Sequence, residues 1–123
     1  METIKKTKNI LFVDDEAALV KMNIIFLHRH GYNVKGTTRA GEALKWFEEN
    51  PHYFGLVITD IAMPEMSGEE MIQQLRMIHP GIKIIVLSGS VHSKQMDMLQ
   101  NIVYLEKPVA PQKLLEQISL LID

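Results

Sequence analysis

The stretch Ile10-Leu11-Phe12-Val13-Asp14-Asp15 sets the pattern for the whole chain. Four consecutive apolar residues stop abruptly at two aspartates, and a run of this length is typical of a strand buried on both faces of a parallel sheet. Comparable runs recur along the sequence, at residues 32–37, 56–58, 82–87 and 102–105. We therefore expect five strands, of which 32–37 is the least apolar.

The segments between these runs have the apolar spacing of amphipathic helices. They cover residues 16–30, 40–49, 68–79, 92–100 and 111–122, and 92–100 is the least regular of them. Ser67 and Glu70 predict a capping box at the start of the third helix, and Pro111 suits the first turn of the last. Strands that alternate with helices favour a parallel sheet with helices on both faces, which is an α/β fold.

Length and composition indicate one soluble domain. The chain has 123 residues, a net charge of -2 and no cysteine, so disulfides and thiolate chemistry are excluded. No basic surplus points to nucleic acid or an anionic membrane, and no apolar run is long enough to span a bilayer. We expect a flexible tail over residues 1–8, one domain over 9–123, and a cytoplasmic location because no signal peptide is visible.

Polar side chains stand at the ends of four of the predicted strands. Asp14 and Asp15 follow the first strand, Asp60 the third, Ser88 the fourth and Lys107 the fifth. Ligands of an open α/β sheet bind beyond the carboxyl ends of its strands. We therefore expect three carboxylates, a hydroxyl and an ammonium at one edge of the sheet.

This set of groups is suited to phosphoryl transfer with a divalent metal. Carboxylates that lie together repel one another, and a hard cation with oxygen ligands, such as Mg²⁺, relieves the repulsion. The ammonium and the hydroxyl can bind phosphoryl oxygens, and phosphoryl transfer depends mainly on positioning and charge neutralisation. One of the carboxylates can act as the nucleophile and become an acyl phosphate.

Each of these residues also has an ordinary structural interpretation. The aspartate pair can cap a helix, Asp60 can form a turn, Ser88 can form a turn with Gly89, and Lys107 can be a surface residue. The joint occurrence of these residues, each at its own strand end, favours the functional interpretation.

Four motifs point to a known family. They are Ile10-Leu11-Phe12-Val13-Asp14-Asp15-Glu16, Asp60-Ile61-Ala62-Met63-Pro64-Glu65-Met66-Ser67-Gly68, Leu87-Ser88-Gly89 and Tyr104-Leu105-Glu106-Lys107-Pro108. With them, the chain from about Ile10 to Ile122 resembles the receiver domains of bacterial response regulators. The resemblance implies a single-domain, flavodoxin-like, doubly wound (βα)5 fold with a parallel sheet of order 2-1-3-4-5.

The resemblance implies a role for each residue of the acceptor site. Asp60 corresponds to the phosphoryl acceptor and Asp15 to a direct Mg²⁺ ligand. Asp14 corresponds to a ligand that acts mainly through water. Asp60 and the backbone carbonyl of Ala62 would complete the protein ligation of the metal.

The resemblance also implies residues that bind the phosphoryl group and respond to it. Lys107 corresponds to the lysine that contacts this group, with Ala62, Ser88 and Gly89 as further phosphoryl-binding positions. Ser88 corresponds to the hydroxyl that moves toward the phosphoryl group, and Tyr104 to the switch aromatic whose rotamer follows. Tyr104 can equally be a half-buried strand aromatic, and both interpretations can hold together.

The implied partners are a phosphodonor and an output. A histidine kinase or a histidine phosphotransfer protein would supply the phosphoryl group, and an effector domain or a downstream protein would receive the signal. A homodimer is possible, whereas direct nucleic-acid or membrane binding is not expected. One alternative is a constitutive protein-binding module that is never phosphorylated. Another, a Mg²⁺-dependent phosphatase with an aspartyl nucleophile, is disfavoured because Ala62 stands where such enzymes place a second aspartate.

The chain departs from the family pattern between Ser88 and Lys107. This segment is a few residues shorter than in most receivers, and Gln100-Asn101 replaces the usual turn of small residues. We expect a short or irregular fourth helix and an altered signalling surface, with the acceptor site unaffected.

Overall fold

The computed structural model describes residues 8–89 and 101–123, which form one parallel β-sheet flanked by helices. The strands are β1 (Asn9–Val13), β2 (Asn33–Thr37), β3 (Leu56–Asp60), β4 (Lys83–Ser88) and β5 (Ile102–Glu106). The described helices are α1 (Ala17–Arg29), α2 (Ala40–Glu49), α3 (Gly68–Ile78) and α5 (Pro111–Ile122). The predicted helix over 92–100 and most of the predicted tail lie outside the described residues.

The strand order is β2-β1-β3-β4-β5, and every neighbouring pair is parallel. The expected α/β fold and its order 2-1-3-4-5 are therefore confirmed. The chain winds outward from β1 to β2, then crosses back to β3 and continues in the other direction. Such a reversal leaves a crevice at the carboxyl ends of the two strands that flank it, here β1 and β3.

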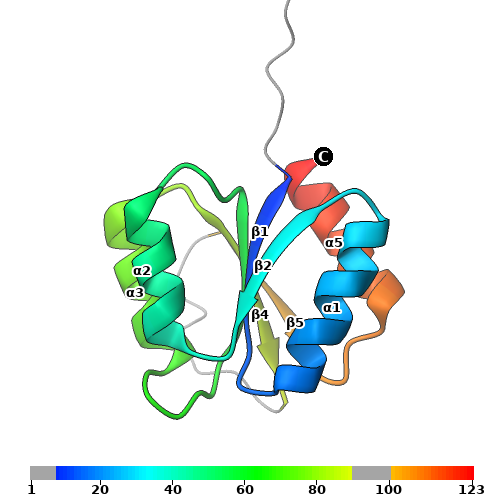
Figure 1. Cartoon of the computed structure of the whole chain (residues 1–123), viewed down its shortest axis with the longest axis horizontal. Coiled ribbons are helices and arrows are strands. Elements are labelled where there is room, and N and C mark those ends of the chain that lie inside the picture. Colours follow the sequence, from blue (N-terminus) through cyan, green and yellow to red (C-terminus); the bar gives the residue numbers. More distant parts are fainter. Residues whose placement is uncertain (1–7, 90–100) are drawn as a thin grey trace, which may run out of the picture.

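Helices cover both faces of the sheet. α1 and α5 lie on one side and α2 and α3 on the other (Figure 1). Neighbouring strand residues alternate between the two layers: Leu11 and Val57 pack beneath α2 and α3, whereas Phe12 and Ile58 pack beneath α1 and α5. The strands read as continuous apolar runs because both of their faces are buried.

The predicted helix signals are confirmed at two helix starts. Ser67 is the N-cap of α3, where its hydroxyl accepts a bond from the Glu70 amide at 3.1 Å and the Glu70 carboxylate accepts one from the Ser67 amide at 3.4 Å. Pro111 is the first residue of α5. Ser67 and Pro111 therefore mark where α3 and α5 begin.

Two strands end later than the apolar runs predicted. Asp60 and Ser88 are the last residues of β3 and β4, rather than residues that follow them. The reason is that backbone pairing does not depend on side-chain polarity. Asp60 pairs with Leu87, and the amide of Lys107 still donates to the Ser88 carbonyl at 2.7 Å.

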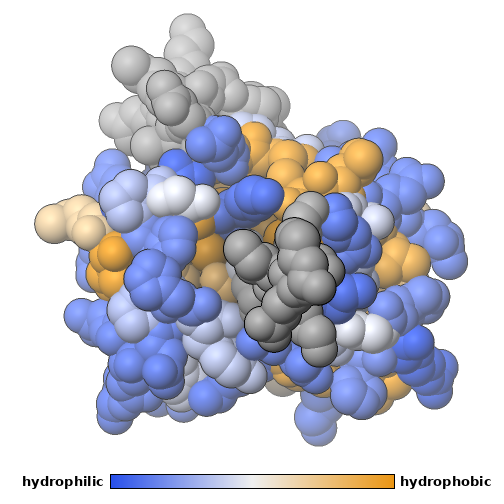
Figure 2. Space-filling model, turned by 90° about the horizontal axis from the view of Figure 1, so that it is seen from above, coloured by the Kyte–Doolittle hydropathy of each residue, from blue (hydrophilic) through white to orange (hydrophobic). Residues whose placement is uncertain are grey.

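The end of the sheet at which the strands begin lies away from the carboxyl ends of the strands. This end carries mostly hydrophilic side chains with smaller hydrophobic areas between them (Figure 2). None of the described helices combines the length and the hydropathy that a membrane crossing requires.

Candidate functional site

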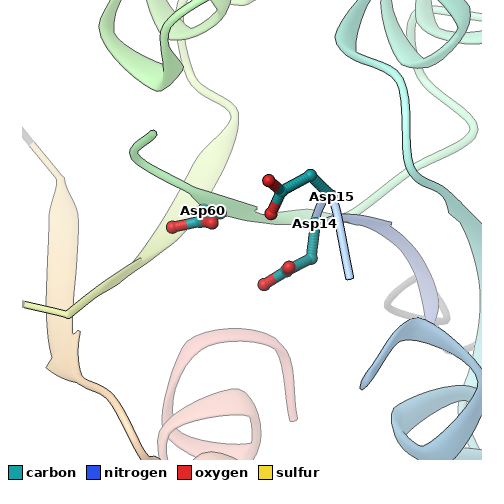
Figure 3. Close-up of side chains that lie close together, drawn as sticks. All are labelled: Asp14, Asp15 and Asp60. Carbon is teal, nitrogen blue, oxygen red and sulfur yellow. The ribbon is translucent and has the colours of Figure 1, made fainter. Parts of the chain in front are cut away.

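Three carboxylates converge at the carboxyl edge of the sheet, as the sequence predicted. Asp14 and Asp15 follow β1 and Asp60 ends β3, which is its neighbour in the sheet. One carboxylate oxygen of each residue lies within 4.8 Å of the other two. Figure 3 shows the three side chains side by side. Asp14 is fully buried and Asp60 is 7% exposed, whereas Asp15 is open to solvent.

Backbone amides hold two of these carboxylates in place. The Glu16 amide donates to Asp14 Oδ1 at 2.9 Å, and the Ile61 amide donates to Asp60 Oδ1 at 2.8 Å. The structure differs from the helix-cap interpretation of the aspartate pair, because the N-cap of α1 is Glu16, whose side chain makes no capping hydrogen bond. Asp14 is instead oriented toward the site.

The ammonium group of Lys107 brings together the carboxyl ends of β1, β3 and β5. Lys107 follows β5, and its Nζ donates to Asp14 Oδ2 at 2.8 Å and lies 3.3 Å from Asp60 Oδ2. The same Nζ lies 3.8 Å from Glu16 Oε1. The surface interpretation of Lys107 is therefore wrong, since its side chain is only 20% exposed and points into the carboxylate cluster.

Burial and charge shift the pKa values of Asp60 and Lys107. Desolvation raises the pKa of Asp60, and with the charge of Asp14 it outweighs the opposing charge of Lys107. Desolvation acts to lower the pKa of Lys107, but the hydrogen bond to Asp14 and the charges of Asp14 and Asp60 outweigh it and raise that pKa. The cluster therefore keeps Lys107 charged, but the single charge of Lys107 does not fully compensate the negative charge of Asp60.

The remaining predicted residues lie around this cluster. Ser88 is buried at the end of β4, one residue beyond the partner of Asp60, and Gly89 is exposed next to it. Ala62 is exposed two residues after Asp60. Tyr104 is half-buried on β5 opposite Val86 and packs against the core beneath α2 and α3.

Glu16 lies at the site but received no role in the sequence-based prediction. It stands in the first motif, but its contact with Lys107 joins residues 91 positions apart in the chain. No local sequence pattern predicts a contact of this kind, because the contact depends on how the loops after β1 and β5 approach each other.

The cluster offers the chemistry of a hard-cation site. Carboxylate oxygens are the ligands that Mg²⁺ prefers, and Mg²⁺ needs few of them because it keeps several waters. The raised pKa of Asp60 reflects burial of negative charge that a divalent cation would compensate. Asp14, Asp15 and Asp60 therefore fit such an ion.

Comparison with known proteins agrees with this geometry. The response regulator receiver domain family matches residues 10–119. The response regulator receiver protein CpdR of Brucella abortus (strain 2308) is 33% identical over 82 residues, which are 67% of this chain and 67% of CpdR. Sensor kinase CckA of the same organism is 38% identical over 80 residues, which are 65% of this chain. The chain spans only 8% of the length of CckA.

A solved structure agrees as well. The CheY-like response regulator receiver domain protein from Methanospirillum hungatei JF-1 has a TM-score of 0.81 and 33% identity, and the match covers 92% of this chain and 91% of that chain. With the match over residues 10–119 and the acidic cluster beside Lys107, the chain belongs to the response regulator receiver domain family, a family of two-component signalling modules.

Proposed function

We propose that the chain accepts a phosphoryl group on Asp60 in a Mg²⁺-dependent reaction and changes conformation to transmit a signal. The observation that carries this proposal is the contact of one ammonium, that of Lys107, with both Asp14 and Asp60. An acidic triad such as Asp14, Asp15 and Asp60 is typical of the Mg²⁺ site of receiver domains.

The two oxygens of Asp60 have different surroundings. Oδ1 accepts the Ile61 amide, whereas Oδ2 lies on the side of Lys107. We assign Oδ2 as the nucleophile: it forms a bond to phosphorus while the bond between phosphorus and the donor breaks. Lys107 then neutralises charge on the phosphoryl oxygens. A bound Mg²⁺ would supply further positive charge to these oxygens.

A receiver domain implies a phosphodonor of the histidine kinase or histidine phosphotransfer class in general. The particular donor, an effector or downstream protein, homodimerisation and a cytoplasmic location are parts of the proposal. Its switch consists of Ser88 and Tyr104, which lie on the adjacent strands β4 and β5. The Ser88 hydroxyl would move toward the phosphoryl group, and the half-buried ring of Tyr104 would follow.

The proposal is tested by incubating the chain with acetyl phosphate and following its intact mass. We expect the mass of one phosphoryl group to be added when Mg²⁺ is present, and peptide mapping to place it on Asp60. A chain that takes up no phosphoryl group at any Mg²⁺ concentration would instead be a constitutive binding module. Release of many phosphates per chain without accumulation of the Asp60 adduct would indicate a phosphatase.

Asp15→Asn is expected to weaken Mg²⁺ binding by at least about tenfold. The change removes one anionic ligand, and a charge-assisted contact is worth about 1.5–3 kcal/mol. Because Asp15 is exposed and has no described bond to the fold, the variant should keep the stability of the wild type. Calorimetric titration measures the affinity. Equal affinities of the variant and the wild type would exclude Asp15 as a ligand.

Ala62→Asn is expected to shorten the lifetime of the phosphorylated state roughly tenfold. Hydrolysis needs a water in line with the bond from Asp60 to phosphorus, and the alanine side chain cannot orient one. One oriented hydrogen bond that contributes ~1.4 kcal/mol to the barrier gives this factor. Ser90, two residues after Ser88, is also expected to border this water path, and it lies outside the described residues.

The matched control is Ala62→Leu, which adds similar bulk without a hydrogen-bonding group. Phosphoryl decay is followed for the three proteins at the same Mg²⁺ concentration. We expect the leucine variant to decay no faster than the wild type. Unchanged decay in Ala62→Asn would show that access of water, rather than its orientation, limits hydrolysis.

A further inference from the structure

Lys107 has three carboxylate contacts among residues 8–89 and 101–123, and they are not equivalent. Asp14 at 2.8 Å and Asp60 at 3.3 Å belong to the triad that fits a metal ion. Glu16, at 3.8 Å, does not belong to it. Two of the three partners of Lys107 are therefore also the groups for which a divalent cation competes.

A cation on the triad weakens the hold of Asp14 and Asp60 on Lys107. Two positive charges that share the same carboxylates repel each other, so the triad binds the ammonium less tightly once the metal is present. The ammonium can then shift toward a carboxylate that the metal does not use. The carboxylate within its present reach that stays free of the metal is Glu16.

The surroundings of Glu16 and Lys107 permit this movement. Both side chains line a cavity of about 540 Å³ between α1 and the segment after β5, so the ammonium has space in which to turn. The Glu16 backbone is fixed to the triad, because its amide donates to Asp14 Oδ1 at 2.9 Å. Its side chain is 69% exposed, so its carboxylate has room to follow the ammonium.

We propose that Glu16 is a positioning residue that takes over the Lys107 ammonium when the metal loads, and so keeps it at the mouth of the site for the incoming phosphoryl group. The inference rests on the proposed function, since it requires Mg²⁺ on the triad. Without metal, the contact of Lys107 with Glu16 is long, at 3.8 Å, and involves a largely exposed glutamate side chain, so it contributes little. With metal, it becomes the main contact of the ammonium.

The test compares Mg²⁺ titrations of wild type, Glu16→Gln and Glu65→Gln. Glu16→Gln keeps the backbone bond to Asp14 but removes the charge that receives Lys107, so we expect Mg²⁺ affinity to fall about threefold, as for loss of one exposed ion pair. Glu65→Gln is the matched control. Glu65 lines another cavity with Asp15 but pairs with Arg39 instead of Lys107. It should change the affinity much less.

A second readout follows the Lys107 ammonium by ¹⁵N NMR, where its signal is sharp only while a partner slows exchange with water. Without metal, we expect the signal in both wild type and Glu16→Gln, because Asp14 and Asp60 hold the group. At saturating Mg²⁺ it should persist in the wild type and disappear in Glu16→Gln. In Glu16→Asp, whose shorter carboxylate keeps the charge, it should return in part.

The outcomes separate this inference from the proposed function. A wild type that binds no Mg²⁺ would overturn both. A wild type that binds Mg²⁺, with Glu16→Gln and Glu65→Gln weakened equally and the ammonium signal the same in wild type and Glu16→Gln, would overturn only the role of Glu16. That result would mean that Glu16 acts only as one more negative charge near the metal.

Discussion

Asp60→Asn is expected to abolish phosphoryl incorporation from acetyl phosphate completely. An amide is a poor nucleophile, and no other described carboxylate combines the position of Asp60 with its contact to Lys107 at 3.3 Å. Asp14, the other close partner of Lys107, is fully buried and already bonds this ammonium and the Glu16 amide. Intact-mass measurement after incubation with Mg²⁺ and the donor reports the loss directly.

The same substitution should raise stability when Mg²⁺ is absent, which shows that the lost labelling is not caused by unfolding. The pKa of Asp60 is raised in the folded state, mainly by desolvation. The folded chain therefore binds the proton of the Asp60 carboxyl group more tightly than the unfolded chain does. Stability is therefore lost as pH rises from the ordinary carboxyl range through that raised pKa. Asparagine removes this loss, so the variant should melt higher than wild type at neutral pH. Labelling of Asp60→Asn at the wild-type rate would contradict the assignment of the acceptor.

Gly68→Ala is expected to destabilise the fold by about 1–3 kcal/mol, the usual cost of forcing a methyl group into packed structure. A Cβ at this first residue of α3 would lie 2.6 Å from the Asp60 carbonyl oxygen and 2.8 Å from Ile61 Cα. Both are backbone atoms, so the start of α3 and the acceptor loop would have to separate. The Gly68 amide would also lose its 2.8 Å bond to the Ile61 carbonyl.

Thermal unfolding should show this cost as a fall in Tm of roughly 4–12 °C. The control is Gly41→Ala in α2, where nothing lies within 4 Å of the added Cβ and alanine is the better helix former. It should be neutral or slightly stabilising. If both alanine variants melt at the wild-type temperature, the close approach at Gly68 is relieved without cost.

The fold was predictable because burial and sequence pattern coincide. Runs such as Ile10 to Val13 are apolar throughout because both faces of each strand are covered. The strand order came from the resemblance carried by the motifs, since periodicity says nothing about which strands are neighbours. The ends of β3 and β4 were misplaced because Asp60 and Ser88 are polar but still pair through the backbone.

The site residues that could be predicted from the sequence are those that stand at the ends of strands. Asp14, Asp15, Asp60 and Lys107 could be assigned to one edge because parallel strands end together. Two features depend on tertiary distances and had no sequence signal of their own. One is the contact of Glu16 with Lys107, and the other is the approach of Gly68 to the Asp60 backbone, which gives the motif glycine its physical reason.

The balance of charge around Lys107 governs the order in which ligands can arrive. Three carboxyl groups, those of Asp14, Glu16 and Asp60, lie within 3.8 Å of this single ammonium, and a fourth, that of Asp15, lies beside Asp14 and Asp60. A divalent cation is drawn in by this field, whereas a small anionic phosphodonor is repelled until the field is neutralised. If the proposed function holds, we therefore expect capture of the metal to precede productive encounter with such a donor. Added salt, which screens charges beyond roughly 8 Å at physiological strength, slows the first event and speeds the second.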